Sequence, residues 1–299
     1  MADVRMTATE RAWLSWGRSG EPAAGGRRRV RPPIPSRHPA AGWLADELER
    51  VLGGTGGFGV VYQPIFDLRT ERLVGVEALA RLTRVPQLPA RCWLAQADSL
   101  GLGIHLQLAI VRRVLTDLAR IPSSLTVSVN LTADAIADPR LLPVLRTVGV
   151  DACRMIVEVV ADGHTDWSAL APPLARLRHL GVRTAVNDAV VRELPGLLPD
   201  IIKLDPSVVR DVDSEPRCQA LAGALMLVAE DLDAVVCAEA IESAAELRYL
   251  RRLGVQLGQG FHLGRPARFP WTIGALVGHQ PRSHGSLPAS PSAHSAGHP

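Results

Sequence analysis

Lysine is almost absent from this chain of 299 residues, which contains one lysine, Lys203, and 32 arginines. Most cationic positions therefore need only a positive charge. Chemistry that requires an amine is different, because the pKa of a lysine shifts readily and arginine cannot replace it in proton transfer. The single lysine is also compatible with chance. Its setting, a strand-like run ending in Lys203-Leu-Asp205, favours a functional role.

Long apolar runs, C-x-x-C pairs and a hydrophobic N-terminal segment are missing as well. The longest apolar stretch, near Ala222–Ala229, is too short to span a bilayer. Residues 1–40 contain no segment of signal-peptide type. Four scattered cysteines favour buried free thiols over disulfides or a zinc site. We therefore expect a cytoplasmic protein without a membrane span.

The positive charge is concentrated in the tails. Of the net charge of +3, residues 1–41 contribute +5, and residues 42–278 sum to about −3. A mildly acidic body argues against a nucleic-acid polymer as the partner. Residues 1–41 are rich in Arg, Pro and Gly, and residues 279–299 in Ser, His and Pro, so both tails are predicted to be disordered. The Arg-rich tail could dock a protein partner or be a plain extension.

Strand-like and helix-like segments alternate between the tails. Several strand candidates are continuous apolar runs, which is typical of parallel strands buried on both faces. The candidates are Val60–Leu68, Leu73–Leu79, Leu125–Leu131, Met155–Val160, Val182–Asp188, Ile201–Asp205 and Ala234–Ala240. Two helices show the 3.6-residue period, with faces formed by Leu106, Ile110, Val114 and Leu118, and by Leu221, Leu225, Val228 and Leu232.

A capping box, Ser243-Ala-Ala-Glu246, opens another helix, which ends at Gly254. Seven or eight β/α units follow one another in residues 42–278 without an internal linker. This organisation predicts an α/β fold with a single TIM-type (β/α)8 barrel.

The predicted strands end in polar side chains, which a barrel would gather at one mouth. They are Glu77, Asn130, Glu158, Asn187 with Asp188, Lys203 and Glu239. Carboxylate and amide oxygens are the ligands that a hard cation such as Mg²⁺ or Mn²⁺ prefers. A lysine beside such a cation could stabilise charge that develops in a reaction at phosphorus. The alternative is that these are ordinary strand-end residues that meet solvent.

An ordered series of motifs resembles a known family. It comprises Tyr62-Gln-Pro-Ile65, Glu77-Ala-Leu79-x-Arg81, Ser128-Val-Asn130, Glu158, Asp188, Asp200-Ile-Ile-Lys203-Leu-Asp205, Ala238-Glu239-Ala-Ile-Glu242 and Gln259-Gly-Phe-His-Leu-Gly-Arg-Pro266. Over roughly residues 45–270, the chain resembles the EAL domain, the cyclic-di-GMP-specific phosphodiesterase module of bacterial signalling. The resemblance implies a barrel of EAL type, cyclic-di-GMP as ligand, linear pGpG as product and a homodimer as an open alternative.

The resemblance also implies roles for individual residues around a pair of Mg²⁺ or Mn²⁺ ions. Glu77, Asn130, Glu158 and Asn187 match the ligands of a first metal, and Asp188 and Glu239 match those of a second. Lys203 matches a lysine that lies beside the attacking water in the family, so the implied catalytic set is Lys203, Glu239 and Asp188. The substrate-binding positions are Gln63, Arg81, Gln259 and Glu242.

Three departures from the family pattern fall together. Asn187 replaces the first aspartate of a D-D-F-G motif, and an amide brings no charge and cannot bridge two metals. The following loop, Ala189-Val-Val-Arg-Glu-Leu194, lacks the glycines of the family and is about five residues shorter. Ala161 replaces a glutamate that anchors that loop. We therefore expect a weakened second metal site and cyclic-di-GMP binding with weak or lost hydrolysis. A fully active phosphodiesterase and a catalytically dead interaction scaffold remain the alternatives.

Overall fold

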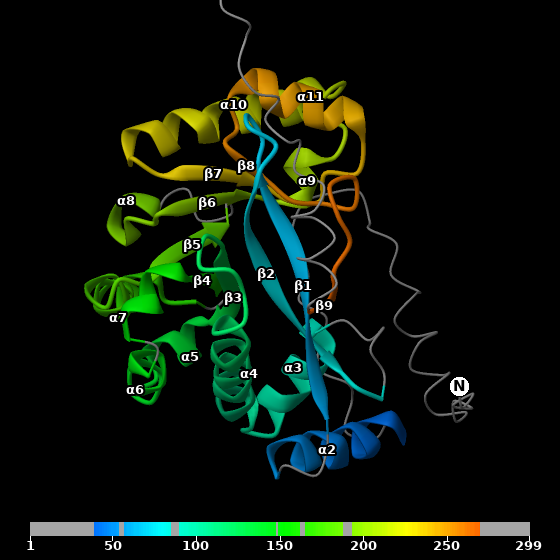
Figure 1. Ribbon diagram of the computed structural model, residues 1–299, viewed down its shortest axis with the longest axis vertical. Helices are drawn as coiled ribbons and strands as arrows, with labels where there is room; N and C mark the ends of the chain where they lie inside the picture. The colour runs from blue at the N-terminus through cyan, green and yellow to red at the C-terminus, as the bar shows by residue number, and fades with distance from the viewer. Residues whose placement is uncertain are drawn as a thin grey trace, which may run out of the picture.

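The computed structural model describes residues 39–53, 57–84, 90–147, 149–161, 165–187 and 193–269. Most of the two predicted tails and the predicted site residue Asp188 lie outside these ranges. Eight strands form a closed barrel, and helices pack around it (Figure 1). In the described part of the chain, no helix is long and apolar enough to cross a membrane.

Seven strands run parallel and the first runs against them. The strands are β1 (Phe58–Asp67), β2 (Leu73–Leu82), β3 (Thr126–Thr132), β4 (Met155–Val160), β5 (Arg183–Asn187), β6 (Ile201–Leu204), β7 (Val235–Ala238) and β8 (Leu257–Gly258). β2 to β8 pair in chain order, and β1 closes the barrel between β8 and β2. A further short strand, β9 (Ala267–Arg268), pairs with β1. The seven predicted strands are confirmed, with boundaries shifted by up to three residues.

The antiparallel direction of β1 corrects the expectation of a regular series of β/α units. Only residues 68–72 separate β1 from β2. A parallel crossover needs a dozen or more residues, so a connection this short can only form a hairpin. The hairpin places Gln63 directly opposite Glu77, which brings two predicted site residues onto neighbouring strands.

The helices follow the order of the connections between strands. They are α2 (Pro39–Leu52), α3 (Ala90–Ser99), α4 (Gly103–Leu118), α5 (Ala133–Ala137), α6 (Leu141–Arg146), α7 (Trp167–His179), α8 (Leu194–Leu197), α9 (Pro206–Val209), α10 (Pro216–Asp231) and α11 (Ala244–Leu253). The predicted capping box of α11 is present, and Gly254 ends the helix with φ of 88°. A left-handed residue at this position favours glycine.

The predicted buried face is confirmed for α4 and only partly for α10. All four predicted residues of α4, from Leu106 to Leu118, are buried. The buried face of α10 consists of Ala222, Leu225 and Ala229. Of the predicted residues, Leu225 is therefore buried, whereas Leu221 is 44% exposed. Small residues on the inner face let the helix approach the sheet closely, which turns the larger Leu221 outward. The predicted face of α10 is therefore wrong in part.

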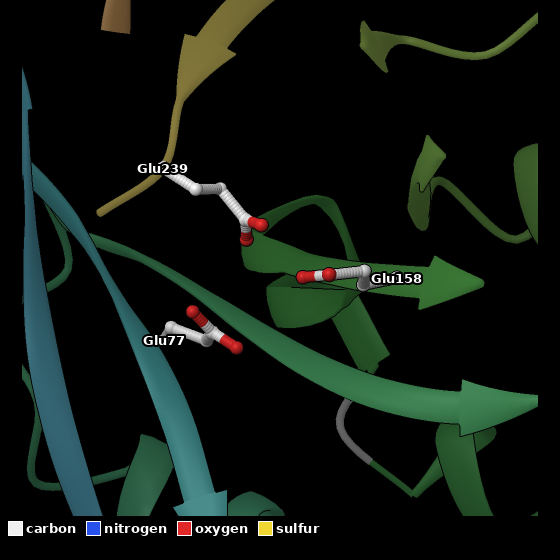
Figure 2. Close-up of side chains that lie close together, drawn as sticks. All are labelled: Glu77, Glu158 and Glu239. Carbon is white, nitrogen blue, oxygen red and sulfur yellow. The ribbon is translucent and has the colours of Figure 1, made fainter. Parts of the chain in front are cut away.

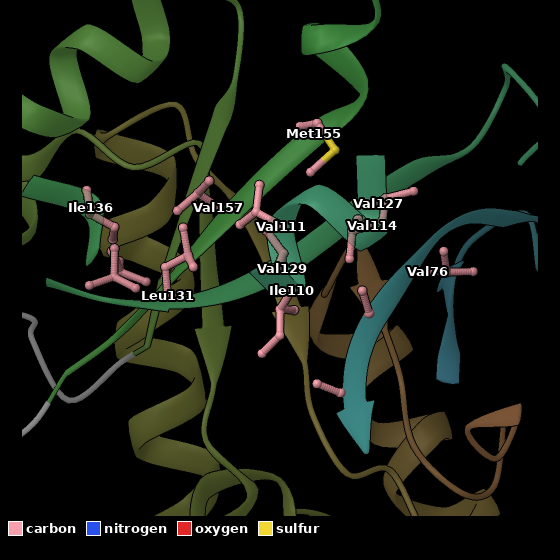
Figure 3. Close-up of a cluster of buried hydrophobic side chains, with 14 of the residues drawn as sticks. Val76, Ile110, Val111, Val114, Val127, Val129, Leu131, Ile136, Met155 and Val157 are labelled. Carbon is pink, nitrogen blue, oxygen red and sulfur yellow. The ribbon is translucent and has the colours of Figure 1, made fainter. Parts of the chain in front are cut away.

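Two apolar layers hold the barrel. Outside the sheet, valines of β2, β3 and β4 pack against Ile110, Val111 and Val114 of α4 (Figure 3). A separate cluster joins five strands: Ile65, Ile156, Ala185, Ile201 and Cys237. Side chains two positions apart share a face of a strand, so the residues beyond this cluster project from the same face into the mouth. They are Gln63, Glu158, Asn187, Lys203 and Glu239.

Candidate active site

Three glutamates from separate strands converge at the mouth of the barrel. Glu77 lies on β2, Glu158 on β4 and Glu239 directly after β7 (Figure 2). Carboxylate oxygens of the three lie within 4.8 Å of one another. Glu77 and Glu158 are buried and Glu239 is partly buried. Carboxylates this close repel one another unless a cation lies between them.

The ammonium of Lys203 supplies a cation in the structure. Its Nζ atom lies 2.6 Å from Oε1 of Glu239 and 3.7 Å from Oε2 of Glu77, and it donates a hydrogen bond to Oε2 of Glu158. The side chain of Lys203 is only 4% exposed. Burial lowers the pKa of Lys203, but the carboxylates of Glu158, Glu77 and Glu239 outweigh burial and raise this pKa well above its ordinary value. The only lysine of the chain thus joins the three acids.

The two buried glutamates differ in proton affinity. Burial raises the pKa of Glu158 to about 8; Lys203 opposes this shift, and the charges of Glu77 and Glu239 add to it. Burial also acts to raise the pKa of Glu77. Lys203 and hydrogen bonds from Asn130 and Gln259 outweigh that effect, so the pKa of Glu77 lies below its usual value. Hydrogen-bond donors therefore stabilise the ionised form of Glu77 in particular.

Two amide side chains hold the carboxylate of Glu77. Nδ2 of Asn130 donates to Oε1 at 2.7 Å, and Nε2 of Gln259 donates to Oε2 at 2.6 Å. With this orientation Asn130 is a hydrogen-bond donor, and its predicted role as a metal ligand requires the amide to turn its oxygen toward the ion. Gln259 is 4% exposed and so is built into the site.

The oxygens of the mouth fit a hard divalent cation. Oδ1 of Asn187 and Oε1 of Gln259 are buried and have no hydrogen-bond partner within the described ranges. A buried carbonyl oxygen without a partner is costly, and a cation would satisfy it. Asn187 is paired with Lys203 in the β5–β6 register, beside the carboxylates. The residues suited to hold the ion are Glu77, Asn130, Glu158, Asn187 and Glu239, all through oxygen.

The predicted substrate-binding residues differ in how close they lie to the carboxylate cluster and in how buried they are. Gln63, opposite Glu77, donates from Nε2 to the carbonyl of Gly264 at 3.3 Å. Arg81 lies four residues beyond Glu77 on the same face of β2 and is partly buried. Burial lowers the pKa of Arg81, and the charge of Glu77 opposes this shift. The side chain of Glu242 is exposed, so the structure leaves it at the rim. Asp188 lies outside the described residues.

Two residues beneath the mouth were not singled out from the sequence as site residues. Ser128 is buried and opposite Glu77, and its Oγ has no hydrogen-bond partner in the described structure. Cys237 is buried and paired with Lys203, and burial raises the pKa of its thiol to about 12. Each lies two positions before a predicted site residue, so the two-residue period of a strand could have found both.

A tight backbone crossing positions Glu239 and Gln259. The N–H of Gln259 donates to the carbonyl of Ala238, and the N–H of Ile241 donates to the carbonyl of Gln259. A Cβ atom at Gly260 would lie 2.2 Å from the backbone of Ile241. Only glycine permits this approach, which fixes the ends of β7 and β8 against each other.

Comparison with known proteins identifies the family. The model of the family described as "EAL domain" matches residues 45–266. The chain therefore belongs to the EAL domain family. The match covers the barrel and every site residue named above.

Two curated relatives illustrate the range of similarity. A "Cyclic di-GMP phosphodiesterase PA2567" of Pseudomonas aeruginosa is 32% identical over 263 residues, covering 81% of this chain and 44% of the relative. "Cyclic di-GMP phosphodiesterase PdeR" of Escherichia coli is 28% identical over 239 residues, covering 75% of this chain and 36% of the relative. The chain thus spans less than half the length of these relatives.

Solved structures share the fold at lower identity. A structure titled "PaMucR Phosphodiesterase, c-di-GMP complex" has a TM-score of 0.68 and 24% identity, covering 77% of this chain and 99% of that one. The Xanthomonas citri FimX EAL domain in complex with c-diGMP has a TM-score of 0.69 and 19% identity, covering 77% and 95%. These similarities establish the TIM-type barrel of the EAL domain.

Proposed function

We propose that the chain binds cyclic-di-GMP at the mouth of its barrel in bacterial signalling, and that its metal-dependent phosphodiesterase activity is weak or lost. The observation that carries the proposal is the ring of Glu77, Glu158 and Glu239 around Lys203, with the uncharged amide of Asn187 beside it. Relatives named as cyclic-di-GMP phosphodiesterases and neighbours solved with c-di-GMP support the choice of ligand.

The site retains hydrogen-bond donors that suit the phosphates and bases of a dinucleotide. Arg81 can pair with a phosphate through its guanidinium, which presents several donors in a planar fork. Gln63 can offer an amide to a base or a phosphate. Both lie on the β1–β2 hairpin next to Glu77. We propose that Gln63, Arg81, Gln259 and Glu242 bind the dinucleotide.

The charge of the mouth argues for one strong metal site. When all three glutamates are ionised, as metal binding requires, their carboxylates and the Lys203 ammonium sum to −2, which one divalent ion neutralises. We propose Mg²⁺ or Mn²⁺, with a first ion on Glu77, Asn130, Glu158 and Asn187 and a weaker second ion on Asp188 and Glu239. When bound, such ions stabilise the charge that develops on phosphoryl oxygens. Because Asn187 adds no negative charge, the affinity for the second ion is lowered more than the affinity for the first.

Side chains of the mouth have separate roles in positioning and in charge stabilisation. Lys203 holds the carboxylates of Glu158 and Glu239 in place and sets a positive charge where a phosphoryl oxygen would gain a negative one. Gln259 and Asn130 orient Glu77. We propose Lys203, Glu239 and Asp188 as the catalytic set of any residual hydrolysis.

Binding and turnover measured on one preparation test the proposal. Calorimetry with cyclic-di-GMP and Ca²⁺ should show binding, which Arg81→Ala should weaken. With Mg²⁺ or Mn²⁺, formation of pGpG should be slow or no faster than in Lys203→Ala. Absence of binding under all of these conditions would refute the proposal and favour the interaction scaffold.

A fully active phosphodiesterase is the second candidate, because all three glutamates and Lys203 are retained in contact. Rapid turnover that Lys203→Ala abolishes would select it. The domain layout belongs to the same proposal: a barrel of residues 42–278, an Arg-rich tail of residues 1–41 that docks a protein partner, and a C-terminal tail of residues 279–299. A cytoplasmic location and a homodimer complete it.

A further inference from the structure

A pocket of about 260 Å³ lies where the first residues of β1 meet β9 and the C-terminal end of the outer helix α4 (Figure 1). None of the residues that line it is one of the predicted site residues. Its walls carry three arginines and two phenylalanines. Pockets for small molecules usually measure about 300–1,000 Å³, so this one suits a small ligand.

The pocket has a surplus of positive charge. Its one acid, Asp117, is 4% exposed and accepts hydrogen bonds from the hydroxyl of Tyr62 at 2.9 Å and from Nε of Arg113 at 3.2 Å. The other two arginines of the pocket, Arg120 and Arg268, are exposed and form no ion pair with any described residue. Two guanidinium groups therefore remain for an anion of charge −2.

Neighbouring groups hold Arg120 in place and offset the negative end of α4. The guanidinium carbon of Arg120 lies 5.0 Å from the centre of the ring of Phe269, a cation–π contact. The buried Arg154 donates to the carbonyls of Leu118 and Ile121 at 3.5 Å and 2.8 Å. The C-terminal end of a helix carries a partial negative charge, which would disfavour an anion. A buried cation thus already neutralises that charge.

A second wall offers an aromatic ring and an open strand edge. The partly buried Phe58 lines the pocket. β9 pairs with β1 at Val61 and Tyr62, and no described strand pairs with Phe58 or Gly59 on that side. Gly59 has no side chain, so it lines the pocket with its backbone. A free strand edge presents N–H and C=O groups, which match the hydrogen-bonding edge of a planar base.

We propose that this pocket binds a nucleoside monophosphate. Arg120 and Arg268 pair with the phosphate, because the fork of a guanidinium fits phosphate oxygens. A phosphate monoester carries a charge of about −1.5 to −2 near neutral pH, which matches two guanidinium groups better than a carboxylate does. The base stacks on Phe58 and meets the backbone at Gly59. The pocket is separate from the mouth, so the inference does not rest on binding of cyclic-di-GMP.

Calorimetry of the full chain with GMP tests the site. Arg120→Gln and Arg268→Gln should each raise the dissociation constant of GMP at least about tenfold, because each removes a charge-assisted contact with phosphate. Phe58→Leu should raise it at least about threefold by removing the stacking surface. Arg112→Gln removes an exposed charge of α4 outside the pocket and is the matched control, which should leave the constant unchanged. Circular dichroism checks that each variant is folded.

Fragments of the probe separate the two halves of the site. Guanosine lacks the phosphate and inorganic phosphate lacks the base, so each should bind at least about tenfold more weakly than GMP. Arg81→Ala, at the mouth of the barrel, should leave GMP binding unchanged.

Three results would overturn the inference. The first is the absence of binding at millimolar GMP. The second is inorganic phosphate that binds as tightly as GMP, which would leave an anion site without a role for the aromatic wall. The third is GMP binding that is lost in Arg81→Ala and kept in Arg120→Gln, which would place the nucleotide at the mouth.

Discussion

Replacing Lys203 by methionine should destabilise the protein when no divalent metal is present. The substitution keeps an unbranched side chain of similar length and removes the cation that contacts Glu77, Glu158 and Glu239. The cluster then loses its positive charge in a mouth where Glu77 and Glu158 are buried. Buried carboxylates that lose their cationic partner are strongly unfavourable.

The magnitude follows from the distances. At an effective dielectric constant of about 20, charges separated by 2.6 Å and 3.7 Å attract with about 6 and about 4.5 kcal/mol. Most of this attraction offsets the desolvation of the charged groups. Removing one partner of a buried ion pair costs about 3–5 kcal/mol. We expect a loss of that size in the free energy of unfolding of Lys203→Met.

Urea denaturation with and without a divalent ion measures this loss. A metal at about 100 times its dissociation constant stabilises the folded state by about 2.7 kcal/mol. Since metal and ammonium neutralise the same carboxylates, Mg²⁺ should stabilise Lys203→Met more than the wild type. Arg251→Met, which removes an ion pair with the exposed Glu71, should cost less than about 1 kcal/mol and serves as the control. If Lys203→Met without metal is as stable as the wild type, the reasoning about the cluster is refuted.

Three further predictions concern single side chains. Asn187→Asp should tighten divalent metal binding at least about tenfold in calorimetry, because it adds a charge to the ring. Tyr62→Phe should lower the free energy of unfolding by about 1–2 kcal/mol, because the tyrosine hydroxyl donates to the buried Asp117 at 2.9 Å. Glu246→Gln should destabilise the fold near neutral pH, because Glu246 accepts the N–H of Ser243 at 2.9 Å in the capping box.

The effect at Glu246 should depend on pH. Burial raises the pKa of Glu246, but hydrogen bonds from backbone N–H groups outweigh burial and hold this pKa below its ordinary value of 4.5. A carboxyl whose folded pKa is lowered stabilises the fold above its unfolded pKa. That stabilisation is lost as the pH falls through the folded pKa. The stability difference between wild type and Glu246→Gln should therefore shrink below pH 4.5.

Each of these predictions has a contradicting result. Unchanged metal affinity in Asn187→Asp would assign the defect to the loop that follows it. Tyr249→Phe, on the outer helix α11, should cost less than Tyr62→Phe, and equal costs would contradict the role of the buried hydrogen bond. A stability difference at Glu246 that grows below pH 4.5 would show that its ionised form is not the stabilising one.

The sequence alone could predict much of the site, because a strand repeats every two residues. Several of the predicted strands are continuous apolar runs, and six of the seven carry a polar site residue near their C-terminal end. Glu158, Lys203 and Glu239 each stand two positions after a residue of the inner apolar cluster. In a closed barrel such positions face one mouth, so their convergence followed from the pattern. The sequence also contains the feature that requires the β1–β2 hairpin, which is the short connection of residues 68–72.

Other features depended on packing that no local pattern records. β8 has two residues, too few to show a period. The outward turn of Leu221 follows from the small inner residues of α10, which matter only against the sheet. The hydrogen bond from Asn130 to Glu77 joins residues 53 positions apart, and that from Gln259 joins residues 182 apart.

The sequence by itself thus determined which residues of this EAL domain carry charge at the ends of strands, including its one lysine. Only the tertiary structure decided that this lysine is buried among three glutamates, and that the acids differ in proton affinity. The reason is physical: the type of a side chain is local, whereas its pKa and its partners depend on burial and on charges from distant strands.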